Sequence, residues 1–164
     1  MSYFNKRRFL IAGAALLLSA CNFTPVYGPQ GAGAKIENRI FITAPNTKDA
    51  YQVTRRLETR LGHADPAPMT LTFSVSNSSA SLGTTATGST TRLQRTGTLN
   101  YTLTNTQSGA RIDKGRVSNF TGYSATGNTA ATLAAERAAI ERLMNVLADQ
   151  LIDRLLLLDP ETLP

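Results

Sequence analysis

The stretch MTLTFSVS, Met69 to Ser76, alternates apolar and hydroxyl side chains without interruption. Because successive side chains of a strand point to opposite faces, this pattern predicts a strand that is buried on one face and polar on the other. Leu71, Phe73 and Val75 would lie on the buried face. Such strands are typical of an antiparallel sheet whose second face meets water or a partner.

Two more strands are predicted after this one. Arg92 to Thr104 places Leu99, Tyr101 and Leu103 on one face, and Arg111 to Tyr123 follows a Gln-Ser-Gly turn. In the latter strand Val117 and Phe120 differ in parity, which predicts a β-bulge. The intervening segment, residues 77–91, is rich in Ser, Thr, Gly and Ala, so we expect a long loop or a frayed hairpin tip.

Alternation of isoleucines predicts another strand over residues 35–43, ahead of the first stretch. A helix is expected over residues 47–61, capped by Asn46 and ended by Gly62. A second, longer helix is expected over residues 130–158, which contain no Gly or Pro and carry a leucine stripe. Its end, residues 155–158, is all Leu, which predicts either deep packing or contact with a partner.

The order strand, helix, three strands, long helix indicates an α+β fold. We expect one domain over residues 35–164, with two helices packed on one face of a four-stranded, mainly antiparallel sheet.

The N-terminus carries Lys6, Arg7 and Arg8, followed by 12 uncharged residues, 9–20, which predicts a signal peptide over residues 1–20. A transmembrane helix needs about 20 apolar residues, so this run is too short to span a membrane. The run ends in Leu-Ser-Ala-Cys, which resembles the lipobox of bacterial lipoproteins. That resemblance implies lipidation of Cys21. Residues 22–34 contain two Pro and three Gly, a composition that predicts a linker, so we expect residues 21–34 to form a lipidated tether. Because Asn22 stands where Asp would favour retention at the inner membrane, we expect the outer membrane.

Composition offers little chemistry for catalysis. The chain has one His, His63, and one Cys, so a nitrogen- or sulfur-based metal site is not expected. A serine nucleophile would lack an obvious base. We therefore expect no enzyme activity, no metal and no cofactor beyond the covalent lipid on Cys21. The formal net charge of +6 falls to +3 in an exported mature chain, which argues against a nucleic-acid partner.

Basic residues gather around the third and fourth predicted strands. Arg92 and Arg95 begin the third strand, and Arg111, Lys114 and Arg116 follow the next turn. Arg95 shares the parity of the buried leucines, so it would lie at the rim of the apolar face or fold outward. The cluster is either an ordinary solvated surface or a site for phosphate or carboxylate groups, which arginine binds well.

Three segments together resemble one family. These are the lipobox with Phe23 to Gly28 after it, the strand TRLQRTGTLNYTL, and the helix TAATLAAERAAIERLMNVLADQLIDRL. They are similar to the lipopolysaccharide-assembly lipoproteins (LptE) of alphaproteobacteria, and the similarity extends over residues 16–158.

The resemblance implies a non-enzymatic lipoprotein, anchored by its lipid at the periplasmic face of the outer membrane. It implies that the protein plugs the outer-membrane barrel LptD and assists lipopolysaccharide assembly. It also implies lipopolysaccharide binding by basic residues at the start of the third strand, for which Arg92 and Arg95 are the matching candidates. The alternative is a periplasmic lipoprotein that scaffolds another complex of the cell envelope.

Overall fold

The fold is an α+β arrangement built around one four-stranded sheet. The computed structural model describes residues 25–29, 31–84, 90–125 and 128–164. In chain order the elements are α2 (Ala32–Ile36), β1 (Ile40–Ile42), α3 (Lys48–Leu61), β2 (Met69–Thr84), β3 (Thr90–Asn105), β4 (Arg111–Ser124), α4 (Thr129–Leu156) and the 3-10 turn η1 (Pro160–Thr162).

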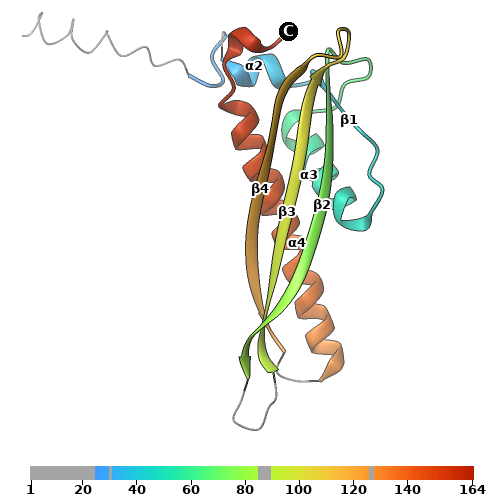
Figure 1. Ribbon diagram of the computed structural model, residues 1–164, viewed down its shortest axis with the longest axis vertical. Coiled ribbons are helices and arrows are strands. Elements are labelled where there is room, and N and C mark those ends of the chain that lie inside the picture. Colours follow the sequence, from blue (N-terminus) through green and yellow to red (C-terminus); the bar gives the residue numbers. More distant parts are fainter. Residues whose placement is uncertain (1–24, 30, 85–89, 126–127) are drawn as a thin grey trace, which may run out of the picture.

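The strands lie in the order β1-β2-β3-β4. β1 runs parallel to β2, whereas β2, β3 and β4 form an antiparallel meander, so the sheet is mixed and mainly antiparallel. β4 lies at one edge and the three-residue β1 at the other. The meander is long, and the molecule is elongated along it (Figure 1). The predicted α+β class and mainly antiparallel sheet are confirmed.

One apolar cluster joins the sheet to the helices. α4 packs along β3 and β4, and α3 packs on α4 and also contacts β1 and β2 (Figure 1). The inward side chains of the meander fill this cluster, and each buried Leu contributes about 1.5–3 kcal/mol relative to an exposed one. Its fully buried large side chains include Leu57, Met69, Leu71, Leu99, Leu103, Leu143, Leu147 and Leu151.

Gly97 shows how closely α4 lies on β3. A Cβ atom at this position would be 2.8 Å from Leu147 Cδ1 and 3.0 Å from Leu143 Cδ2. A side chain at this position would have to displace the ends of these two leucine side chains. Gly97 therefore allows α4 to lie close to the centre of the sheet.

α3 forms where the sequence predicts a helix, with one change at its start. The Thr47 hydroxyl, and not Asn46, caps the helix by accepting from the Ala50 amide at 3.1 Å. Gly62 ends the helix with a φ of +77°, a conformation that favours glycine. The apolar stripe of this helix is buried, as predicted.

The predicted strand over residues 35–43 is wrong in its first half. Residues 32–36 form the short helix α2, and only Ile40–Ile42 pair with β2. Gly31 and Gly33 allow this because the chain at Val26 and Tyr27 packs directly on them. A Cβ on Gly31 would be 2.2 Å from the Val26 carbonyl oxygen. Glycines in the segment predicted as a tether therefore serve close packing.

Of the two alternatives predicted for residues 77–91, the hairpin is observed, and the loop is wrong for residues 77–84. β2 continues to Thr84 and pairs with β3 along this whole length, with register shifts near Gly83. Most side chains over residues 78–82 are small, and Leu82 is exposed, so backbone hydrogen bonds hold this part of the hairpin together without a buried apolar face. Residues 85–89 lie outside the described residues.

The predicted bulge between Val117 and Phe120 is absent from β4, since both residues keep regular pairing with β3. Val117 is buried and Phe120 is 66% exposed, because they lie on opposite faces of one regular strand. The register shift of this pair of strands occurs instead at Leu103/Thr104, where Ile112 is the extra residue.

The all-Leu segment, residues 155–158, begins in α4 and is mostly packed, as the first of the two alternatives predicts. Leu155 is fully buried, and Leu156 and Leu158 pack partly against the core. Leu157 is 79% exposed. Deep packing therefore explains most of this segment.

Candidate functional site

The outer face of the sheet, defined as the face of β2, β3 and β4 that points away from the core, is polar. Register places Thr72, Thr102 and Lys114 in one row across the strands. Ser74, Asn100 and Arg116 form the next row. The outer face therefore presents hydroxyl, amide and basic groups together.

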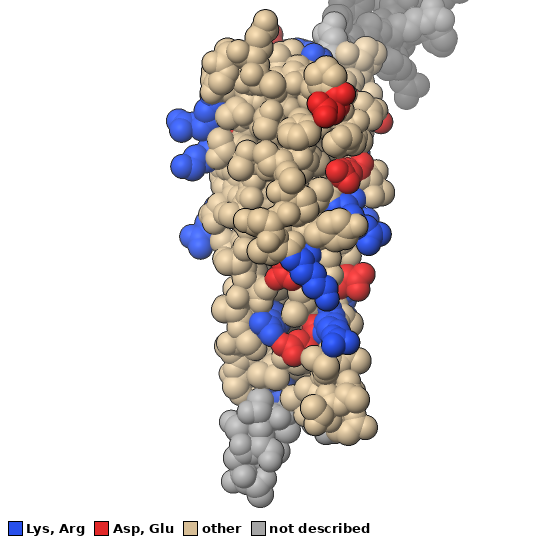
Figure 2. Space-filling view, turned by 90° about the vertical axis from the view of Figure 1, so that its right-hand side faces the viewer, with Lys and Arg blue, Asp and Glu red and all other residues tan. Residues whose placement is uncertain are grey.

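Four cations lie on the outer face, and no Asp or Glu occupies an outward position of β2, β3 or β4 within the described residues. Three of the four, Arg111, Lys114 and Arg116, lie along β4 and are called the basic row. They line a shallow hollow together with Asn100, Ile112, Asp113 and Gly115. In Figure 2 basic side chains project from the left edge, which faces the viewer in Figure 1, and the visible acidic side chains lie away from that edge.

Arg95 lies on the opposite face of β3, toward α4, and is held in a polar network. Its Nη1 donates to Asn77 Oδ1 at 2.9 Å, and its Nη2 donates to Glu136 Oε1 on α4. Asn77 Nδ2 in turn donates to Asp49 Oδ2 on α3. The hydrogen bond that Arg95 donates to Glu136 raises the pKa of Arg95, whose side chain is only 19% exposed. This network connects α3, β2, β3 and α4, so Arg95 has a structural role.

Arg92 has different surroundings from Arg95. It pairs through its backbone with Gly83 and Ser124 and has an exposed side chain. Arg92 and Arg95 are three positions apart along a regularly paired strand, so the two side chains point to opposite faces of β3. The structure thus does not bring the two predicted lipopolysaccharide-binding arginines together.

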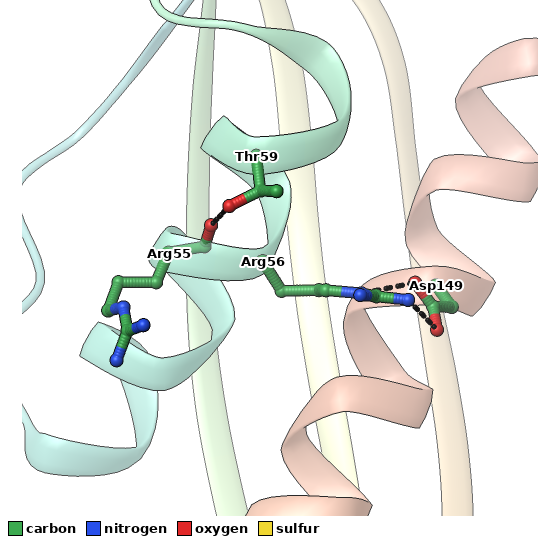
Figure 3. A network of polar contacts seen from close by, with 4 residues as sticks. All are labelled: Arg55, Arg56, Thr59 and Asp149. Carbon is green, nitrogen blue, oxygen red and sulfur yellow. Dashed lines mark hydrogen bonds and ion pairs between the residues drawn. The ribbon is translucent and has the colours of Figure 1, made fainter.

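A second ion pair joins α3 to α4. Arg56 Nε and Nη2 donate to the two carboxylate oxygens of Asp149 at 2.8 and 3.0 Å (Figure 3). Hydrogen bonding and charge from Asp149 raise the pKa of Arg56. Arg55, its neighbour, keeps an exposed guanidinium, while its carbonyl accepts from the Thr59 hydroxyl at 2.7 Å. This ion pair therefore links α3 to α4.

Asp113, the one acidic residue of β4, is hydrogen-bonded on the inner side of the sheet. Its Oδ2 accepts from the Tyr101 hydroxyl at 2.8 Å. Burial, followed by this bond, raises the pKa of Tyr101 to about 12. Gly115 leaves room for the phenol, since a Cβ there would be 2.7 Å from Tyr101 Oη. The Asp113 carboxylate is thus engaged by Tyr101, although Asp113 also lines the hollow beside the basic row.

Neither a metal site nor a membrane-spanning helix is evident in the described ranges. No group of three or more His, Cys, Asp or Glu residues there could hold a metal ion. His63 Nδ1 lies 3.5 Å from Glu58 Oε1, and its ring is tilted against Phe41 with centroids 6.2 Å apart. No described helix is long and apolar enough to cross a membrane. Cys21, the predicted lipidation site, lies outside the described residues.

Comparison with protein families gives one match. The family model described as lipopolysaccharide-assembly (LptE) matches residues 38–155, more than two thirds of the chain. No curated protein matches the chain at a significant level.

Solved structures share the fold. A candidate lipoprotein from Caulobacter crescentus CB15 is 20% identical with a TM-score of 0.62, over 76% of this chain and 92% of its own. The rare lipoprotein B of Shewanella oneidensis is 12% identical with a TM-score of 0.53, over 71% and 90%. A minor lipoprotein of Acinetobacter baumannii is 15% identical with a TM-score of 0.53, over 79% and 95%. At these identities the likeness concerns the fold.

Proposed function

The chain belongs to the LptE family of lipopolysaccharide-assembly proteins, and from this membership we propose that it is a non-enzymatic outer-membrane lipoprotein that plugs the barrel LptD. In this role it assists LptD in placing lipopolysaccharide at the outer membrane. The observation that carries the proposal is the extent of the family match, which spans the whole meander together with α3 and most of α4.

The two faces of the sheet support a plug. We infer that α3 and α4 cover one face and leave the outer face for the wall of the barrel. The lumen of a large outer-membrane barrel is polar. Hydroxyl and amide side chains such as those of Thr72, Thr102 and Asn100 suit such a wall, because they can both donate and accept hydrogen bonds.

A lipid on Cys21 would hold the domain close to the membrane. Only four residue steps separate Cys21 from Pro25, the first described residue, and an extended chain of that length spans at most about 14 Å. The segment at Pro25 lies at the same end of the molecule as α2 and the β3–β4 turn (Figure 1). This end would therefore face the periplasmic leaflet.

We place the proposed lipopolysaccharide contact at Arg92 in preference to Arg95. Arg92 is exposed and among the described residues makes no ion pair, whereas the Arg95 guanidinium is bound to Glu136. An anionic lipid would have to compete with Glu136 and Asn77 for Arg95. Arg92→Ala should then weaken lipopolysaccharide binding in a salt-dependent way.

The test is co-purification of the full chain with LptD from membranes solubilised in mild detergent. We expect the wild-type chain to be recovered with the barrel, and Cys21→Ser to be lost from the membrane fraction. Recovery of the wild-type chain as a solitary monomer would contradict the proposal. Depletion separates it from the scaffolding alternative: we expect defective lipopolysaccharide transport, and cell-wall defects alone would favour a scaffold.

A further inference from the structure

We propose that the basic row docks the outer face of the sheet on an acidic protein surface. Under the proposed function, on which this inference rests, that surface is part of the barrel wall. The basic row is Arg111, Lys114 and Arg116, and it identifies both the side of this chain that meets the partner and the charge that the partner must carry there.

Charge distribution is the first argument. Among the described residues Arg56 pairs with Asp149 and Arg95 with Glu136. Within the same residues the basic row makes no ion pair. Exposed Arg55 and Arg142 lie on helices that also carry acids, whereas the basic row projects from a strand face whose outward positions carry none. Cations without an intramolecular partner attract a surface of opposite charge and repel one of like charge.

The shape of the face is the second argument. β2, β3 and β4 run side by side with hydroxyl and amide groups between the cations. At about 4.8 Å between strands and 3.3 Å per residue, three strands of roughly 14 residues present about 650 Å². A standard interface buries about 800 Å² per partner, so this face supplies most of one.

The mixture of groups favours a protein partner over a lipid headgroup layer. Asn100 and Thr102 can each donate and accept, and they lie beside the basic row, as does Thr104, whose hydroxyl donates to the Thr70 carbonyl and can still accept. Phosphate oxygens only accept, so a phosphate layer would use the cations and leave the acceptors of these side chains to water. Protein side chains can match both kinds of group.

The experiment uses full-length chain co-expressed with LptD and extracted in mild detergent. The variant Lys114→Glu/Arg116→Glu reverses two exposed charges on the outer face. Its matched control, Arg55→Glu/Arg142→Glu, makes the same charge change at exposed positions of the helices. A milder pair, Lys114→Gln/Arg116→Gln, removes the charges without reversal. Melting temperatures of all three test for folding.

We expect the charge-reversal variant to lose about tenfold or more of the co-purified barrel at low salt, because like charges would face each other. The Gln variant should lose less of the co-purified barrel. The helix control should recover about as much barrel as wild type does. Wild-type recovery should fall as salt shortens the Debye length.

Equal recovery of the outer-face variant and wild type would overturn the inference while the proposed function stands. The inference would also be overturned if the outer-face variant lost binding to lipopolysaccharide or anionic vesicles but still recovered the barrel, because the outer face would then bind lipid. Failure of wild type to bring down the barrel would overturn the proposed function and this inference with it.

Discussion

The inner and outer faces of the sheet are made by the same three strands, yet they differ in nearly every respect. On the inner face Leu71, Leu99 and Leu103 are fully buried and Arg95 is paired with Glu136. On the outer face hydroxyls and cations without ion pairs among the described residues alternate with them residue by residue. We expect the inner face to hold the fold together and the outer face to tolerate substitution with little effect on folding.

Within a single strand, one set of residues therefore stabilises the fold and the alternate set is available to contact a partner. Substitutions at neighbouring residues of β3 should change the free energy of unfolding by amounts that depend on the face each residue occupies. The following comparisons test this from the largest expected effect to the smallest.

The largest contrast is between Leu99 and Thr98. Leu99→Ala should lower the free energy of unfolding by about 2–5 kcal/mol, because it leaves a cavity in the core. Thr98→Val, one residue away on the outer face, should change it by no more than about 0.5 kcal/mol. Urea denaturation measures both. Similar losses for the two would show that the outer face is also packed.

A second contrast concerns added volume. Gly97→Val would drive a side chain into Leu143 and Leu147 and should cost about 1–3 kcal/mol. Thr96→Val adds no comparable crowding on the outer face and should be nearly neutral. Thermal unfolding of the two variants decides between them. A neutral Gly97→Val would mean that α4 can move away from β3 freely.

The two arginines form the third contrast. Arg95→Met leaves Asn77 and Glu136 without their partner in a half-buried place and should cost about 1–3 kcal/mol. Arg92→Met should leave stability within about 0.5 kcal/mol. Chemical denaturation of both variants is the measurement. Equal stabilities would remove the structural role from Arg95 and restore it as a lipid-contact candidate.

The smallest effect is a pH dependence from the inner face. The pKa of Tyr101 is raised from 10.0 to about 12. Between these pH values the folded chain therefore keeps the phenol proton that the unfolded chain has already lost. Its contribution to stability is present below about pH 10 and is lost as pH rises toward 12. Between these values the melting temperature of wild type should fall more steeply than that of Tyr101→Phe. Parallel curves would contradict the assignment.

Much of this contrast could be predicted from sequence, because alternation is a local property. The buried set of β2 and β3 and the inward parity of Arg95 follow from a period of two. The partner of Arg95 could not be predicted, since Glu136 lies 41 residues further along the chain. The register that aligns Lys114 with Thr102 is likewise set by pairing across strands.

Two elements were mispredicted for opposite reasons. The far part of β2 has Leu82 as its one large apolar side chain and no apolar alternation, so nothing in its pattern distinguishes a backbone-paired hairpin from a loop. At Gly31 and Gly33, by contrast, composition suggested freedom where the fold needs close contact with Val26 and Tyr27. Glycine permits both, and only the surrounding packing determines which occurs.

The edge position of β4 has one more consequence. An edge strand of 14 residues offers backbone groups to which another strand can add, a common route to aggregation. Two copies pairing edge to edge through β4 would bring Lys114 and Arg116 of one chain close to those of the other. Their mutual repulsion opposes this pairing, so the charges proposed to select a partner also keep copies of the chain apart while they are unassembled.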